Sequence, residues 1–232
     1  MLRPPSWRAL RPLLQGGFAL LLRQGALNVG FVAATRKAQA LDPTGVAAAA
    51  YAITMQIYSL GVVVQLGVQG AAAALVPAAL SLPPSNGGGP RLARRTADRL
   101  FAWGATIGIG MATAQLLLIP HITPLFSTLP QIQRAVVAPC RTSALVQVLN
   151  GIIFAGEGVL MGVGGFGFLA GLTSVGVLAM VCGLMLPNCG LNGILLSLGA
   201  FHVVQAAGVL YHHLRLGPLA VRRATENGHM RE

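Results

Sequence analysis

"VAAAAYAITMQIYSLGVVVQLGVQGAAAALVPA", residues 46–78, is the stretch that decides the fold class of this protein. It contains no Asp, Glu, Lys or Arg, and its residues are predominantly apolar. A helix needs roughly 20 such residues to cross the hydrocarbon core of a bilayer. The stretch is longer than that, so we expect a spanning helix that is tilted, kinked or partly outside the bilayer.

The composition of the whole chain agrees with a membrane protein. Of its 232 residues, 54% are hydrophobic and 9% are charged, with a mean hydropathy of +0.70. Soluble domains carry about 25% charged residues. The net charge is +11, but the basic residues stand at the ends of apolar segments. That arrangement predicts a lipid bilayer, and not nucleic acid, as the partner of the basic residues.

Six segments are apolar and long enough to span a membrane, which predicts an all-α bundle of about six transmembrane helices. The expected spans are residues 13–35, 46–78, 98–119, 139–160, 167–186 and 191–213. Between and around them we expect a basic N-terminal segment (1–12), a Pro/Gly-rich basic linker (81–97), an interfacial segment (121–138) and a polar basic tail (215–232).

The distribution of Lys and Arg predicts the orientation in the membrane. An even number of spans puts both termini on one side, and the segments on that side carry eleven Lys and Arg residues. The opposite side carries four, and Arg23 lies within a span. The positive-inside rule therefore predicts that both termini face the cytosol or its organellar equivalent. The plastid envelope is one candidate membrane.

The chain contains no HExxH motif, nucleophile elbow or cluster with metal-ligand spacing, so we predict neither an enzyme nor a metal site. "GVGGFG", residues 162–167, lacks the strand and the lysine of a phosphate-binding loop. It is interpreted as a tight connection between helices. The three cysteines are interpreted as small apolar residues with free thiols.

Glu157, in "GIIFAGEGVLMG" (residues 151–162), is the only acidic residue between Asp98 and Glu226. A carboxylate at membrane depth is costly unless it is paired, protonated or used. One interpretation is a site for a coupling cation, a proton or a cationic substrate. The other is a structural ion pair, with Arg23 as the candidate partner.

Several polar residues within the predicted spans are candidates to line a cavity with Glu157. Gln24 and Asn28 are four residues apart and share one helical face, and Asn150 lies two turns before Glu157. Gln56 lies in the second span. The alternative for each amide is an interhelical hydrogen bond without a functional role.

The stretch from residue 20 to 78 resembles the start of the C-terminal lobe of the multidrug and toxic compound extrusion (MATE) family, with the DinF-like and plant detoxification branch nearest. Arg23 matches an arginine of the family's seventh helix, Gln56 matches a glutamine of its eighth, and "AAAALV" (71–76) stands where the family has "AAQALV". "NGIIFAGEGVLMGVGGFGFL" (150–169) is similar to the family's tenth helix, in which Glu157 takes the place of the acidic residue.

This resemblance covers residues 17–222 and implies a cation-coupled antiporter, which exchanges H⁺ or Na⁺ for organic cations, xenobiotics or metabolites and needs no other cofactor. It implies that Glu157 is an acid of the central cavity. The sequence departs from the family's pattern at Leu66, Tyr51 and Ala73.

Only six spans are visible where the family has twelve. We therefore expect either a fragment or a half-size protein that pairs with a complementary N-terminal lobe, and favour the fragment. The competing functions are a non-transporting membrane scaffold or assembly protein and a flippase for lipid-linked precursors from the same superfamily.

Overall fold

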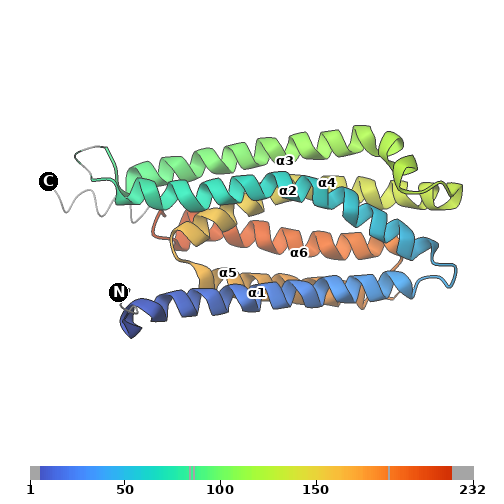
Figure 1. Ribbon diagram of the computed structural model, residues 1–232, viewed down its shortest axis with the longest axis horizontal. Coiled ribbons are helices and arrows are strands. Elements are labelled where there is room, and N and C mark those ends of the chain that lie inside the picture. Colours follow the sequence, from blue (N-terminus) through green and yellow to red (C-terminus); the bar gives the residue numbers. More distant parts are fainter. Residues whose placement is uncertain (1–5, 84, 86, 188, 221–232) are drawn as a thin grey trace, which may run out of the picture.

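The computed structural model describes residues 6–83, 85, 87–187 and 189–220, and this part of the chain is helical with no β-strand. Each of its six long helices is apolar enough to cross a membrane, which confirms the predicted all-α fold of six spans. The helices are α1 (Trp7–Gln39), α2 (Val46–Ser81), α3 (Pro90–Phe126), α4 (Pro130–Gly162), α5 (Phe166–Leu184) and α6 (Leu191–Tyr211), and a π-helical turn η2 (His212–Leu216) follows (Figure 1).

Two predicted connections are largely helical in the structure. The linker predicted at 81–97 is shorter in the structure, because α2 ends at Ser81 and α3 begins at Pro90. The interfacial segment predicted at 121–138 consists of the end of α3 and the start of α4, which residues 127–129 join. Pro90 and Pro130 each occupy the first turn of a helix. A backbone N–H in the first turn has no carbonyl partner within the helix, so its absence in proline costs no hydrogen bond. Both prolines start helices here instead of interrupting them.

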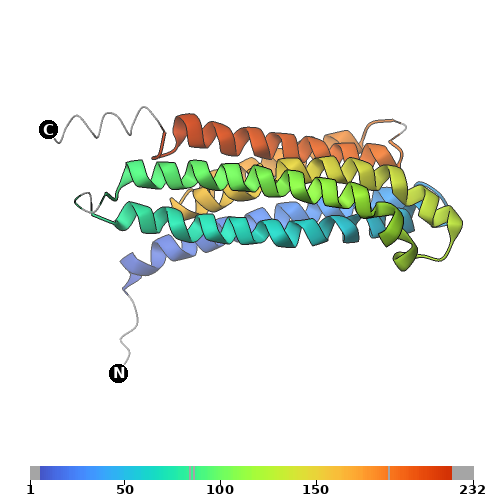
Figure 2. The ribbon, with the colours of Figure 1, turned by 90° about the horizontal axis from the view of Figure 1, so that it is seen from above.

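The predicted terminal segments lie only partly within the described residues. α1 begins at Trp7, inside the segment predicted as 1–12, and Arg215 of the predicted tail belongs to η2. Residues 1–5 and 221–232 lie outside the described part of the chain. The start of α1 and the end of η2 lie at the same end of the bundle, together with the 82–89 connection (Figures 1 and 2).

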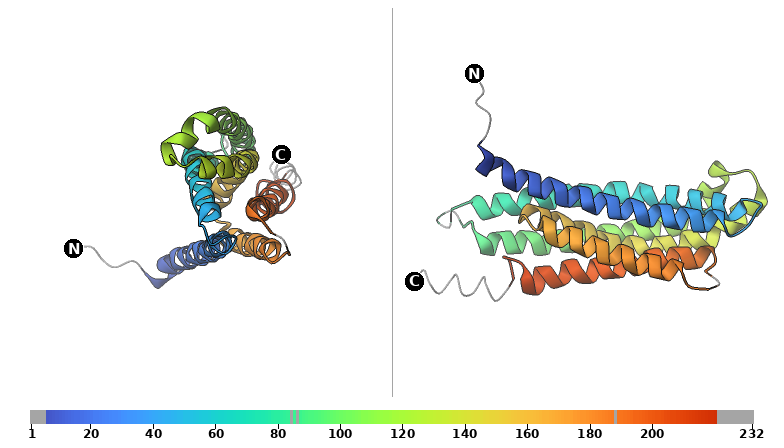
Figure 3. Two further views of the ribbon diagram at one scale, coloured as in Figure 1. Left: turned by 90° about the vertical axis from the view of Figure 1, so that its right-hand side faces the viewer. Right: turned by 90° about the horizontal axis from the view of Figure 1, so that it is seen from below.

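The helices form two groups when the bundle is viewed along its length (Figure 3). α2, α3 and α4 pack together, while α1 packs mainly on α5, and α5 packs on α6. α6 also packs on α4 and so joins the groups, whereas α1 meets α2 along a short stretch only. α4 is the most buried of the six helices.

The α3–α4 contact depends on glycine. A Cβ atom at Gly104 would lie 2.3 Å from the carbonyl oxygen of Gly151, and one at Gly151 would lie 2.0 Å from that of Gly104. Neither helix backbone could remain in place with a larger residue there. Such close approach through small residues is how helices associate in a bilayer, where the surrounding lipid is as apolar as the side chains.

The start of α2 is fixed by Asp42 in the preceding turn. Its carboxylate accepts a hydrogen bond from the Thr44 hydroxyl and a 2.8 Å bond from the backbone N–H of Ala47, in the first turn of the helix. The Thr44 hydroxyl and the Ala47 N–H hold the pKa of Asp42 below its ordinary value. A negative charge is favourable there because helix N-termini carry partial positive charge.

Candidate functional site

Glu157 lies in the second half of α4 with 2% of its surface exposed. Arg23 of α1 binds one carboxylate oxygen, with 2.5 Å between Arg23 Nη2 and Glu157 Oε1. Gln69 of α2 donates a 2.7 Å hydrogen bond from Nε2 to the other oxygen, Oε2. The Glu157 carboxylate therefore connects three helices, α1, α2 and α4.

Glycines on both sides of Glu157 bring the neighbouring helices within reach. A Cβ atom at Gly158 would lie 2.3 Å from the Gln69 carbonyl oxygen, so α2 passes closely enough for the Gln69 side chain to reach the carboxylate. A Cβ atom at Gly156 would lie 2.6 Å from Val209 of α6. The local sequence "GEG" thus allows α4 to be enclosed between α2 and α6 at the level of the acid.

Arg23 reaches Glu157 from a helix that has few other contacts with this part of the bundle. Its side chain is 18% exposed, and its Nε makes no hydrogen bond within the described residues. Removal of one partner from a buried ion pair destabilises a protein by about 3–5 kcal/mol, because the other charge stays buried and unpaired. The pair is therefore a strong link between α1 and α4 while both groups are charged, and a weak one once Glu157 is neutral.

The other predicted cavity residues make no hydrogen bond with Glu157. Gln24 and Asn28 bond weakly with each other, with 3.4 Å between Gln24 Nε2 and Asn28 Oδ1, and both are exposed on α1. Gln56 is exposed on α2. The structure thus brings Arg23 to Glu157 and leaves three of the four amides on the outer surface of the bundle.

Asn150, the fourth predicted amide, belongs to a second buried cluster. It donates a 2.7 Å hydrogen bond from Nδ2 to the hydroxyl oxygen of Tyr58, which lies 2.8 Å from His202 Nε2. His202 Nδ1 lies 2.6 Å from the carbonyl oxygen of Leu198. A carbonyl only accepts, so Nδ1 carries the proton, Nε2 accepts, and Tyr58 donates to it. This chain of bonds joins α2, α4 and α6.

Glutamines extend this cluster toward α3. Gln147 donates a 2.8 Å hydrogen bond from Nε2 to the Tyr58 carbonyl, and Gln65 donates from Nε2 to the Gln147 side-chain oxygen at 3.1 Å. Gln115 of α3 donates to Ser143 Oγ at 2.7 Å. Buried amides of this kind are expected to pair across helices, because lipid provides no other partners.

Sequence reasoning did not select Tyr58, Gln69 or His202 as site residues. The spacing of Gln65 and Gln69, four residues apart, is a usable signal for one buried polar face on α2. The role of Tyr58 has no such signal, because both partners of its hydroxyl lie on other helices.

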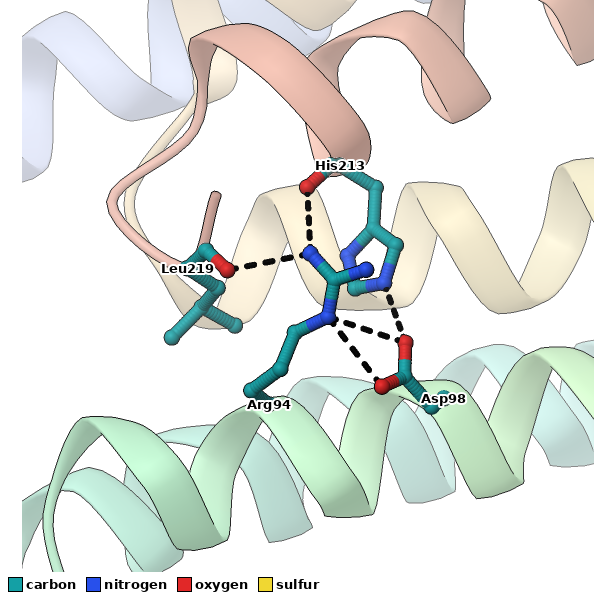
Figure 4. Close-up of polar contacts among 4 residues, drawn as sticks. All are labelled: Arg94, Asp98, His213 and Leu219. Atoms are coloured by element: carbon teal, nitrogen blue, oxygen red, sulfur yellow. Dashed lines mark hydrogen bonds and ion pairs between the residues drawn. The ribbon is translucent and has the colours of Figure 1, made fainter. Parts of the chain in front are cut away.

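A third polar cluster fastens the segment that follows α6, from His213 to Leu219, to the start of α3 (Figure 4). Arg94 Nη1 donates to the carbonyl oxygens of His213, at 2.8 Å, and Leu219, at 3.0 Å. Asp98 accepts from Arg94 Nε and lies 2.7 Å from His213 Nε2. This cluster stands at the end of the bundle that also contains the start of α1 (Figure 1).

No protein-family model and no curated protein sequence matches this chain. Solved structures do match its fold. An outward-facing multidrug resistance MATE family transporter of the MOP superfamily superposes with a TM-score of 0.80 and 19% identity, over 94% of this chain and 49% of that protein. This is the fold of MATE transporters over about half their length.

Two further structures give the same result. A MATE point mutant superposes with a TM-score of 0.79 and 19% identity, over 93% of this chain and 48% of its own. A MOP superfamily transporter from Pyrococcus furiosus superposes with a TM-score of 0.67 and 13% identity, over 91% of this chain and 45% of its own. The six apolar helices and these neighbours identify the chain as an integral, multi-pass membrane protein.

Proposed function

We propose that this chain is one lobe of a secondary transporter of MATE type, in which Glu157 couples the movement of a cation to the export of an organic cation, xenobiotic or metabolite. The observation that carries the proposal is the position of Glu157. Among the described residues that follow Asp98, Glu157 is the only acid. Its carboxylate is bound by Arg23 of α1 and Gln69 of α2.

The proposed coupling step is competition for the carboxylate. A proton, a Na⁺ ion or a cationic substrate that binds Glu157 replaces the charge of Arg23 as its partner. α1 then loses its ion pair with α4 and retains its packing on α5. Movement of α1 relative to α2 and α4 is the conformational change that we assign to cation binding.

The exposed amides support a second lobe as the partner of this one. Gln24, Asn28 and Gln56 lie on the outer surface at positions within the spanning helices. Lipid satisfies no amide hydrogen bonds, whereas a cavity shared with a second lobe supplies water and polar groups. We propose that this surface lines such a cavity and that the second lobe corresponds to the N-terminal half of the matched transporters.

The test is export of a fluorescent organic cation from cells or proteoliposomes that contain the chain together with such a lobe. Glu157→Gln should abolish cation-dependent export and, although less stable than the wild type, should still be a monodisperse, folded protein. Asp42→Asn is the matched control, because it removes a carboxylate outside the bundle, and it should export normally.

Two outcomes decide against this role. Normal export by Glu157→Gln means that Glu157 does not couple transport. Unfolding of both Glu157→Gln and the double variant Arg23→Gln/Glu157→Gln, which removes both charges of the pair, means that the ion pair is structural, as in a non-transporting scaffold.

A further inference from the structure

The first turns of α3 carry a stripe of exposed basic residues that the transport proposal does not use. Arg91, Arg95 and Arg99 recur every four residues, and Trp103 follows one turn later. Residues at this spacing project from neighbouring positions on one helical face. All three arginines are exposed, and Trp103 is 65% exposed. We call these four residues the α3 stripe.

The acid nearest to the stripe is already engaged. Asp98 is bound by Arg94, one turn earlier on α3, and by His213 of η2 (Figure 4). Within the part of the chain that the structure describes, none of the three stripe arginines has an ion-pair partner. Arg94 thus serves the packing of the bundle, while its three neighbours present unpaired guanidinium groups outward.

Trp103 indicates the depth of the stripe in the membrane. Tryptophan prefers the boundary between headgroups and hydrocarbon, and the next charged residue along α3 and α4 is Arg134. With a rise of 1.5 Å per residue, Arg99 lies about 6 Å and Arg95 about 12 Å further along the helix axis. The levels of Arg99 and Arg95 fall within or just outside the headgroup layer, where the long side chains can reach lipid phosphates. Arg91 lies about 18 Å from Trp103 along the axis and adds its charge from beyond that layer.

We propose that the α3 stripe is a binding site for the headgroups of anionic phospholipids. Guanidinium groups bind phosphate through paired, charge-assisted hydrogen bonds, and three of them in register on one face can hold more than one headgroup. The indole of Trp103 packs at the start of the acyl chains. The site selects anionic over zwitterionic lipid because the latter brings its own positive charge to each phosphate.

The chain offers a direct reporter for this site. It has two tryptophans, Trp7 and Trp103, so the Trp7→Phe variant leaves Trp103 as the sole emitter. The full chain with this substitution is reconstituted in phosphatidylcholine vesicles that contain brominated phosphatidylglycerol or, at the same mole fraction, brominated phosphatidylcholine. Bromine quenches indole only at short range, so quenching reports which lipid lies against Trp103.

We expect brominated phosphatidylglycerol to quench Trp103 with roughly tenfold higher apparent affinity than brominated phosphatidylcholine. The triple variant Arg91→Gln/Arg95→Gln/Arg99→Gln should lose this preference. The corresponding triple Lys variant should retain part of it, since it keeps the charges and loses the paired hydrogen bonds.

The matched control removes three arginines elsewhere. Arg36, Arg134 and Arg141 are exposed, Arg36 near the end of α1 and the other two in the first half of α4. The end of α1 and the start of α4 lie at the opposite end of the bundle from the start of α3 (Figure 1). The triple Gln variant of these arginines has the same net charge as the stripe variant and should keep the full preference. Two results would overturn the proposal. One is equal quenching of Trp103 by both brominated lipids in the Trp7→Phe protein, and the other is an equal loss of the preference for phosphatidylglycerol in the two triple Gln variants.

Discussion

Tyr58 of α2 and His202 of α6 form a buried hydrogen bond, with 2.8 Å between Tyr58 Oη and His202 Nε2, across a separation of 144 residues. The same hydroxyl accepts from Asn150 of α4. One phenol oxygen therefore connects three helices, and α6 is the helix that joins the two groups of the bundle.

Replacing Tyr58 by Phe should destabilise the protein by about 1–2 kcal/mol, because Asn150 and His202 each lose a bond inside the bundle. The measurement is thermal unfolding in detergent. Tyr211→Phe serves as the control, since Tyr211 is 56% exposed. If the two variants melt alike, the Tyr58 hydroxyl does not contribute to stability.

Gly104→Ala should destabilise the α3–α4 contact by about 2 kcal/mol or more, because the new methyl group would overlap the Gly151 carbonyl oxygen. Gly110 lies on the same helix, and a Cβ atom there would have no neighbour within 4 Å. Gly110→Ala should therefore be neutral or stabilise by up to about 1 kcal/mol, through helix propensity. The measurement is the free energy of unfolding of the two variants under the same conditions. Equal free energies would mean that the close α3–α4 contact at Gly104 does not contribute to stability.

Arg94→Gln should release the segment from His213 to Leu219, because one guanidinium holds both carbonyl oxygens. Hydrogen exchange and limited proteolysis should then show faster exchange and new cleavage after α6. Arg91→Gln, which replaces an exposed arginine in the same turn of α3, should leave protection unchanged. Unchanged protection in Arg94→Gln as well would mean that other contacts hold this segment.

Asp42 should make stability depend on acidity. The Thr44 hydroxyl and the Ala47 N–H lower the pKa of Asp42 in the folded state, so its contribution is complete above the unfolded pKa and is lost as the pH falls through the folded one. The wild type should therefore lose stability relative to Asp42→Asn below about pH 4. The test is the melting temperature of both proteins across this pH range. If the melting temperatures of the wild type and Asp42→Asn change in parallel with pH, Asp42 does not contribute to this pH dependence.

The fold class followed from the sequence because apolar length is a property of each segment alone, as residues 46–78 illustrate. The ends of the helices were harder to predict, because a proline such as Pro90 or Pro130 can either interrupt a helix or occupy its first turn. A buried acid with Arg23 as a candidate partner could be predicted from the rarity of charge at membrane depth. Gln69 as its second partner could not, since that contact depends on how closely α2 passes Gly158.

The Arg23–Glu157 pair also has a consequence for the order of biosynthesis. The two residues are 134 positions apart, so α1 leaves the ribosome well before its counter-charge exists. Its span has the lowest mean hydropathy of the six, 1.3 against 2.0 for α5. An arginine near the middle of a helix opposes insertion by about 2.5–3.5 kcal/mol. We therefore expect α1 to enter the bilayer inefficiently on its own and to be retained there only once α4 has been synthesised.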